Sequence, residues 1–144
     1  MAQRVRTFIW LLLRGKLLTN VERHRRRMTD DSLCSICQAE PESLDHVFKV
    51  CHTASSVWKK VLPNDLLTDF GCHPIQSWLR HIIVSTLLPD SWKIGICLTC
   101  SKLWEVRNKR IFTGEAFTAE GIAAQIKSMA IHTQDCFAKF SLIL

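Results

Sequence analysis

Four residues in the first third of the chain have the types and the spacing of a metal site. Two residues separate Cys34 from Cys37, eight separate Cys37 from His46, and four separate His46 from Cys51. A Cys-x2-Cys pair lets one tight turn direct two thiolates at the same ion, and three thiolates with one imidazole form a closed structural set for zinc. Soft sulfur donors disfavour calcium and magnesium. The spacing therefore predicts one Zn²⁺ ion held by Cys34, Cys37, His46 and Cys51.

The alternative interpretation is that these cysteines are ordinary core residues. The stretch from 29 to 42 is polar and too poor in apolar side chains to fold by itself, which favours a metal. His52 could replace His46 as the nitrogen ligand, but it directly follows Cys51 and would have to turn sharply. Four protein ligands leave no position for a reactive water, so we expect a structural site and not a catalytic one.

The remaining cysteines give weaker patterns. Cys97-x2-Cys100 lies inside a predicted helix, where both thiols are expected to pack as small apolar groups without a redox role. Cys72 beside His73 lacks the second pair of ligands that another metal site would need, and Cys136 is a single helix cysteine. Seven cysteines without a secretory signal favour thiols over disulfides, and hence an intracellular, reducing compartment, whether nucleus or cytoplasm.

Helices are the elements that must position the four ligands. Thr19 and Glu22 fit a capping box, Ser43 precedes His46 as a cap, and Thr53 is placed to cap the next helix. Apolar spacing predicts helices over residues 5–13, 19–28, 53–62, 75–87 and 90–112 and after 118, with a candidate boundary between the prolines at 63 and 74. The predicted fold is all-α, a small helical domain stapled by one zinc knuckle, with at most a tiny hairpin there. Trp10 and Trp58 are expected to be buried.

Positive charge is concentrated at the amino-terminal end. The chain has a formal net charge of +6, and residues 1–30 contain eight Lys and Arg against two acids, so they carry the whole excess. Such a segment suits a polyanion, and it also suits a solvated helix face. The candidate nucleic-acid contacts are Arg14, Lys16, Arg23, Arg25, Arg26 and Arg27. On a continuous helix Arg23, Arg26 and Arg27 would share one face.

Enzyme activity has no positive support in the sequence. The chain offers no defensible nucleophile, glycine-rich phosphate loop or paired carboxylates, so neither catalysis nor a small-molecule substrate is predicted. Its apolar runs are interrupted by charges, and no membrane span is predicted. Arg107 with Asn108 has two interpretations, a phosphate contact or a cap on helix carbonyls near a C-terminus, and we favour the structural one.

With these motifs in place, the chain resembles the reverse-transcriptase zinc-binding domain of plant non-LTR (LINE-type) retroelements. The resemblance is carried by residues 8–12 (FIWLL), 17–20 (LLTN), 25–27 (RRR), 34–37 (CSIC), 40–48 (EPESLDHVF), Cys51, Ala54 and 57–58 (VW), and more loosely by 104–108 (WEVRN) with Phe112. Family members often have proline at the positions of Leu18 and His52. Neither departure touches a predicted ligand.

The resemblance implies a division of the chain and an association with nucleic acid. Residues 1–62 would be the zinc-binding domain, and residues 63–144 a helical extension leading toward a ribonuclease H domain that this chain lacks. The expected function is a zinc-binding, nucleic-acid-binding module derived from a retrotransposon reverse transcriptase polyprotein, without catalysis of its own. The alternative is a zinc-stapled protein-interaction scaffold or an inert retroelement remnant. The choice between RNA and DNA and the oligomeric state stay open.

Overall fold

The protein is all-α, as predicted. The computed structural model describes residues 2–133, with side chains up to Met129. Its helices are α1 (Gln3–Leu13), α2 (Asn20–Arg25), the π-helical turn η1 (His46–Val50), α3 (His52–Val61), α4 (Asn64–Gly71), α5 (Ile75–Val84), α6 (Asp90–Thr113) and α7 (Ala119–Thr133). In this part of the chain the only β-type pairing is one antiparallel bridge between Leu33 and Pro41, the tiny hairpin expected at the knuckle.

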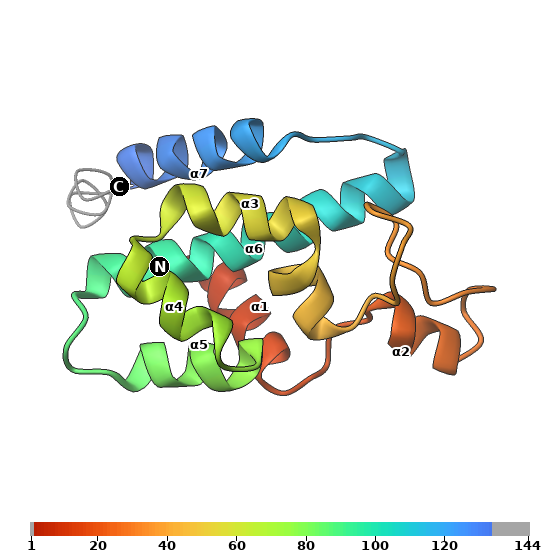
Figure 1. The fold of residues 1–144 in the computed structure, drawn as a ribbon, viewed down its shortest axis with the longest axis horizontal. Helices are drawn as coiled ribbons and strands as arrows, with labels where there is room; N and C mark the ends of the chain where they lie inside the picture. The colour runs from red at the N-terminus through yellow and green to blue at the C-terminus, as the bar shows by residue number, and fades with distance from the viewer. Residues whose placement is uncertain (1, 134–144) are drawn as a thin grey trace.

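The long helix α6 runs through the middle of the molecule (Figure 1). Helices α3 and α7 lie side by side on one flank of α6, and α1 packs against α6 and α5 on the other. Helix α2 and the extended loop that follows it form one end of the molecule, while α4 and α5 form the opposite end (Figure 1). The fold therefore places the predicted zinc knuckle at one end of the central helix.

Helix α1 turns one apolar stripe toward the core. Val5, Ile9 and Leu12 are buried at the spacing of successive helical turns. The helix ends just before Gly15, whose φ of +65° is a conformation that glycine adopts without steric cost. Trp10 falls outside the stripe and is 51% exposed, so the prediction that it is buried is wrong. Its position beside the stripe, one residue after Ile9, turns the indole toward solvent.

Trp58, in contrast, is fully buried as predicted, and it organises the aromatic core. Its indole nitrogen donates a 2.6 Å hydrogen bond to the carbonyl of Phe48. The Trp58 ring packs against Phe70 and Trp78 with centroid separations of 5.0 and 5.7 Å. Phe70 comes from α4, a helix that the sequence analysis did not anticipate between the two prolines. The core is therefore shared between residues on both sides of position 62, while the division of the chain at that point stays a prediction.

The helix caps were predicted with mixed success. Thr19 accepts a hydrogen bond from the Glu22 backbone nitrogen, which confirms half of the capping box. The other half is wrong, because the Glu22 carboxylate turns to Arg25 and Arg26 instead of the Thr19 backbone. Helix α3 begins at His52, one residue before the predicted cap at Thr53. The predicted cap at Ser43 is confirmed by its hydrogen bond from the His46 nitrogen.

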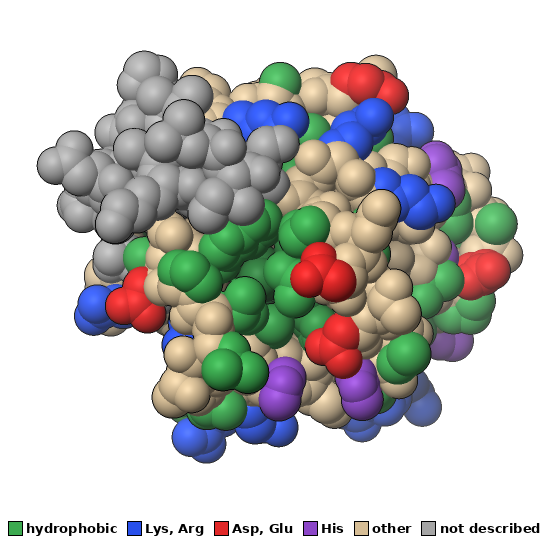
Figure 2. Space-filling model, turned by 60° about the vertical axis from the view of Figure 1, so that its left-hand side comes forward, with side chains coloured by type: hydrophobic (Ala, Val, Ile, Leu, Met, Phe, Trp, Pro, Cys, Tyr) green, Lys and Arg blue, Asp and Glu red, His purple; other side chains and the backbone are tan. Residues whose placement is uncertain are grey.

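The surface is uneven in character. Figure 2 shows one face on which hydrophobic side chains fill the centre, with acidic and histidine side chains next to them and Lys and Arg at the margins. Among the described residues, no helix is both long enough and apolar enough to cross a membrane. On the face drawn in Figure 2, the Lys and Arg side chains lie at the margins of the hydrophobic area.

Candidate metal centre

The first two ligands lie on a tight turn that the backbone stabilises. The nitrogen of Gln38 donates to the Cys34 carbonyl at 2.8 Å, and Gln38 itself has a φ of +54°. The Ile36 nitrogen points at the Cys34 sulfur at 3.4 Å, a contact that favours the thiolate. The Cys34 nitrogen in turn donates to the carbonyl of Glu40, which closes a short hairpin. The turn therefore directs both sulfurs to its inner side.

The second pair of ligands lies at the two ends of a π-helical turn. The Cys51 nitrogen donates to the His46 carbonyl at 2.9 Å, a bond that spans five residues where an α-helix spans four. The wider turn brings residues five apart back toward the same side of the helix, which an α-helical spacing would not do. The His46-x4-Cys51 spacing is thus explained by this one turn.

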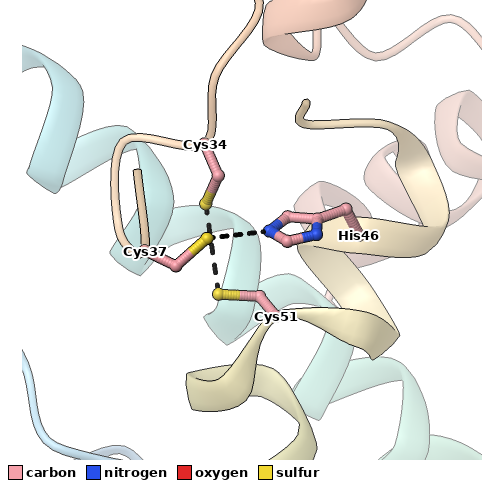
Figure 3. A group of neighbouring side chains, drawn as sticks. All are labelled: Cys34, Cys37, His46 and Cys51. Carbon is pink, nitrogen blue, oxygen red and sulfur yellow. Dashed lines mark hydrogen bonds between the residues drawn. The ribbon is translucent and has the colours of Figure 1, made fainter. Parts of the chain in front are cut away.

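The four side chains point toward one another (Figure 3). Their ligand atoms all lie within 4.8 Å of one another. The Cys34 and Cys51 sulfurs are 4.0 Å apart, and the Cys37 sulfur is 3.4 Å from His46 Nε2. With Zn–S and Zn–N bonds of about 2.3 and 2.0 Å, the edges of a ligand tetrahedron measure about 3.5–3.8 Å. The donor set and its spacing therefore fit a tetrahedral zinc ion.

Burial and proton sharing also suit a metal here. Cys34, His46 and Cys51 are buried, and Cys37 is partly so. The hydrogen bond between the Cys34 and Cys51 sulfurs raises the pKa of Cys34, with burial adding to the shift, and lowers the pKa of Cys51. A divalent ion displaces thiol protons when it binds, so its affinity is expected to fall as the pH falls.

A carboxylate outside the cluster lies near the second nitrogen of the His46 imidazole ring. Glu40 Oε2 lies 3.5 Å from His46 Nδ1, too far and too poorly aligned for a full hydrogen bond, so this buried nitrogen has no hydrogen-bond partner among the described residues. Zinc-bound histidines commonly donate their second N–H to such a carboxylate, which fixes the tautomer. A small movement of the exposed Glu40 side chain would complete that arrangement. Glu40 was not among the site residues predicted from the sequence.

A buried polar network connects the knuckle to α6. The Arg107 guanidinium donates to both carboxylate oxygens of Glu42, and the two side chains are only 2% and 0% exposed. Asn20 donates from its backbone to Glu42 and from its amide to the Leu33 carbonyl, both at 2.7 Å. Arg107 also donates to the Leu18 carbonyl, and its guanidinium lies over the Trp104 ring. This network fixes the loop beneath the ligands.

Arg107 has a structural role, as favoured from the sequence, but it binds Glu42 and the Leu18 carbonyl and does not cap the carbonyls of its own helix end. The sequence around Arg107 is rich in charged residues, and Glu42 is one of several acids near the ligands, so no local pattern singles out this pair. Neither residue type is often fully buried unless it is paired. Asn20 also has a structural role, because its side-chain amide donates to Leu33 and Ser35 and so connects α2 to the hairpin.

The other candidate residues do not join the cluster. His52 is exposed, and its ring contacts Thr53, so the structure brings His46 and not His52 to the three sulfurs. Cys72 is exposed, and the neighbouring His73 pairs with Asp69. Cys97 and Cys100 are buried inside α6, where burial raises the pKa of Cys97 to about 11, as expected of core thiols. Cys136 lies outside the described residues.

The predicted basic residues differ in their exposure and in their ion pairing. Helix α2 ends at Arg25, and Arg27 has a φ of +60°, so the prediction that Arg23, Arg26 and Arg27 share one helix face is wrong. Arg25 and Arg26 both bind Glu22, which cancels one of their charges, and their hydrogen bonds lower the pKa of that carboxyl to about 2. Arg23 is partly buried and donates to Asn20.

Three of the predicted basic residues are free of ion pairs. Arg14, Lys16 and Arg27 are exposed, and no carboxylate of the described residues lies within ion-pairing distance of them. Arg14 contacts the Trp10 ring instead. These three side chains therefore keep their full charge for a partner.

The amino-terminal part of the chain matches a known family. Residues 1–58 match the model of the family described as zinc-binding in reverse transcriptase, which confirms the resemblance drawn from the sequence. An Arabidopsis thaliana protein named as a ribonuclease H protein is 32% identical over 77 residues, which are 54% of this chain and 12% of the relative. The chain thus spans only a small part of that relative's length. No solved structure matches the chain.

Proposed function

We propose, from the premise that residues 1–58 are a zinc-binding domain of the reverse-transcriptase type, that this chain is a zinc-stapled module that binds nucleic acid and has no catalytic activity of its own. The observation that carries the proposal is a closed set of four ligands in a chain whose Arg14, Lys16 and Arg27 side chains are exposed and without an ion pair among the described residues. We further propose that the module derives from a retrotransposon reverse transcriptase polyprotein. Three thiolate ligands also favour a reducing compartment.

The zinc would act on structure and not on chemistry. Four protein donors fill the tetrahedron, so no position is left at which a water could be activated. The ion would hold the knuckle against η1 and so fix the segments on either side of it. Arg14 and Lys16, which follow α1, and Arg27, which follows α2, would then be held in defined positions for a partner.

Nucleic acid is the partner that the unpaired charge favours. Phosphate contacts position a protein on a strand without reading its sequence, so we expect weak binding with little sequence preference. A protein-interaction scaffold is the second candidate, and it is favoured by the exposed apolar side chains of Val84 and Leu87 at the opposite end of the molecule. The two functions differ in their response to salt, because counterion release makes only phosphate binding steeply salt-dependent.

Changing Arg14, Lys16 and Arg27 together to glutamine is expected to flatten the salt dependence of nucleic-acid binding. Each phosphate contact contributes roughly 0.7–0.9 log units of affinity per decade of salt, so the slope should fall by about two units. Fluorescence anisotropy with a labelled oligonucleotide at several salt concentrations measures the slope. Zinc content and helicity should not change, because all three side chains are exposed.

A control with the same loss of charge separates local contacts from net charge. Lys59, Lys60 and Lys127, on α3 and α7, are changed to glutamine in that control. It should keep the wild-type slope. A wild type that shows no binding at low salt, or a triple variant that binds as the wild type does, would refute the nucleic-acid role and favour the scaffold.

A further inference from the structure

Trp10 is a large aromatic side chain that the core leaves half in water. It lies on α1 beside the buried stripe, and 51% of its surface is exposed. The other described tryptophans are buried or partly buried. An exposed indole forgoes much of the stabilisation that burial would give, and such rings are typical of contact surfaces.

Arginines flank the ring along the helix. The Arg14 guanidinium carbon is 4.7 Å from the ring centroid, within the range of a cation–π contact. Arg6 and Arg14 lie four residues before and after Trp10, so they occupy neighbouring positions on the same side of α1. All three side chains are exposed. The indole thus lies in a row between two cations.

Two hollows adjoin Trp10, and both are bordered by cations. The first is lined by Trp10, Leu13, Arg14, Lys16 and Arg80. The second, about 330 Å³ in volume, has apolar walls that include Ile83 and Ile94, with Arg6 and Lys93 at its border. None of the described residues that line either hollow is an aspartate or a glutamate. An aromatic ring with apolar walls and positive charge alone is complementary to a planar base attached to a phosphate.

Helix α5 holds this surface in place. Arg80 donates to the Leu13 carbonyl at 3.1 Å, and the Gln76 amide donates to the carbonyls of Leu12 and Leu13 at 3.3 Å. These bonds satisfy the last carbonyls of α1, which have no partner within their own helix. The end of α1 that carries Arg14 is therefore fixed relative to Arg80, and the surface exists before any ligand binds.

We infer that this surface binds single-stranded nucleic acid, with an unpaired base stacked on Trp10 and neighbouring phosphates bound by Arg6, Arg14, Lys16 and Arg80. Duplex bases already stack on one another, so an indole of this kind selects unpaired strands. The inference rests on the proposed function and adds to it the strandedness of the ligand and the residue that recognises it. Stacking is tolerant of sequence because every base presents a π face.

The test compares Trp10→Leu and Trp10→Phe with the wild type. Each protein is titrated at low salt against a labelled single strand and against a duplex of the same length. Trp10→Leu should lose about tenfold in affinity for the single strand, and Trp10→Phe should recover most of that loss. Duplex binding should change little. The single strand should also quench tryptophan fluorescence in the wild type, and this quenching should be absent in Trp10→Leu.

Leu87→Ala is the matched control for loss of an exposed apolar side chain, because Leu87 is 92% exposed and lines neither hollow. It should bind as the wild type does. If the wild type binds both oligonucleotides and Trp10→Leu binds the single strand equally well, stacking is refuted while the nucleic-acid role stands. If the wild type binds neither, the proposed function itself fails, and the apolar hollow is better explained as a protein contact.

Discussion

Replacing Cys34 and Cys51 together by serine is expected to abolish zinc binding and to unfold the zinc-binding end of the molecule. The two sulfurs face each other at 4.0 Å across the site, so their loss leaves only one thiolate and one imidazole. Structural zinc binds finger peptides with about 10–16 kcal/mol, and the hairpin has little apolar surface with which to replace that energy. Amide hydrogen exchange should report loss of protection from the hairpin through η1.

In the same double variant, the aromatic core around Trp58 should lose less of its structure than the zinc-binding hairpin does. Trp58, Phe70 and Trp78 contact one another and none of them is a ligand, so part of the helical signal should survive in the double variant. Cys72→Ser is the matched control, because Cys72 is an exposed thiol outside the cluster. It should keep one zinc per chain and the wild-type exchange pattern. Full zinc occupancy in the Cys34→Ser, Cys51→Ser variant would contradict the ligand assignment.

Arg107→Met is expected to destabilise the protein by about 3–5 kcal/mol. Removing one partner of a buried ion pair leaves the other charge without compensation, and Glu42 is fully buried. The loss should appear in the free energy of unfolding, measured by denaturant titration with zinc in excess. Zinc affinity should also decrease, because Glu42 and Asn20 together fix the loop that carries the knuckle.

The double variant Glu42→Gln, Arg107→Met separates the uncompensated charge from lost packing. It should be more stable than Arg107→Met alone, because it leaves no buried charge. Arg110→Met, one turn further along α6, is the matched control, since Arg110 is only half-buried and bonds to backbone carbonyls. Arg110→Met should lower the free energy of unfolding much less than Arg107→Met does. A loss below about 1 kcal/mol for Arg107→Met would show that the buried pair does not hold the knuckle.

The zinc cluster and the helical class could be predicted because both depend on short-range patterns. The Cys-x2-Cys turn encodes its own backbone geometry, and the spacing from His46 to Cys51 suits one helical turn. Cys97 and Cys100 were predicted as core residues for the same reason, because their helix could be recognised from its apolar content. The four metal ligands all lie between residues 34 and 51.

The errors concern one helix face, one helix end and one buried ion pair. Trp10 was expected inside, yet Val5, Ile9 and Leu12 already fill the inward stripe of α1. The basic helix was expected to continue past Arg25, but the backbone turns at Arg27. The pairing of Glu42 with Arg107 joins residues 65 positions apart, and no local pattern indicates it. The first two features are local and depend on details of the helix register and of the helix end, whereas the ion pair depends on the tertiary structure.

The central claim is that Cys34, Cys37, His46 and Cys51 hold one structural zinc ion. X-ray absorption at the zinc edge tests it most directly, on protein purified under reducing conditions with its metal content measured on the same sample. The structure predicts one zinc per chain with three sulfur neighbours at about 2.3 Å and one nitrogen at about 2.0 Å. A first shell of oxygen ligands, or fewer than three sulfurs at full occupancy, would contradict the claim.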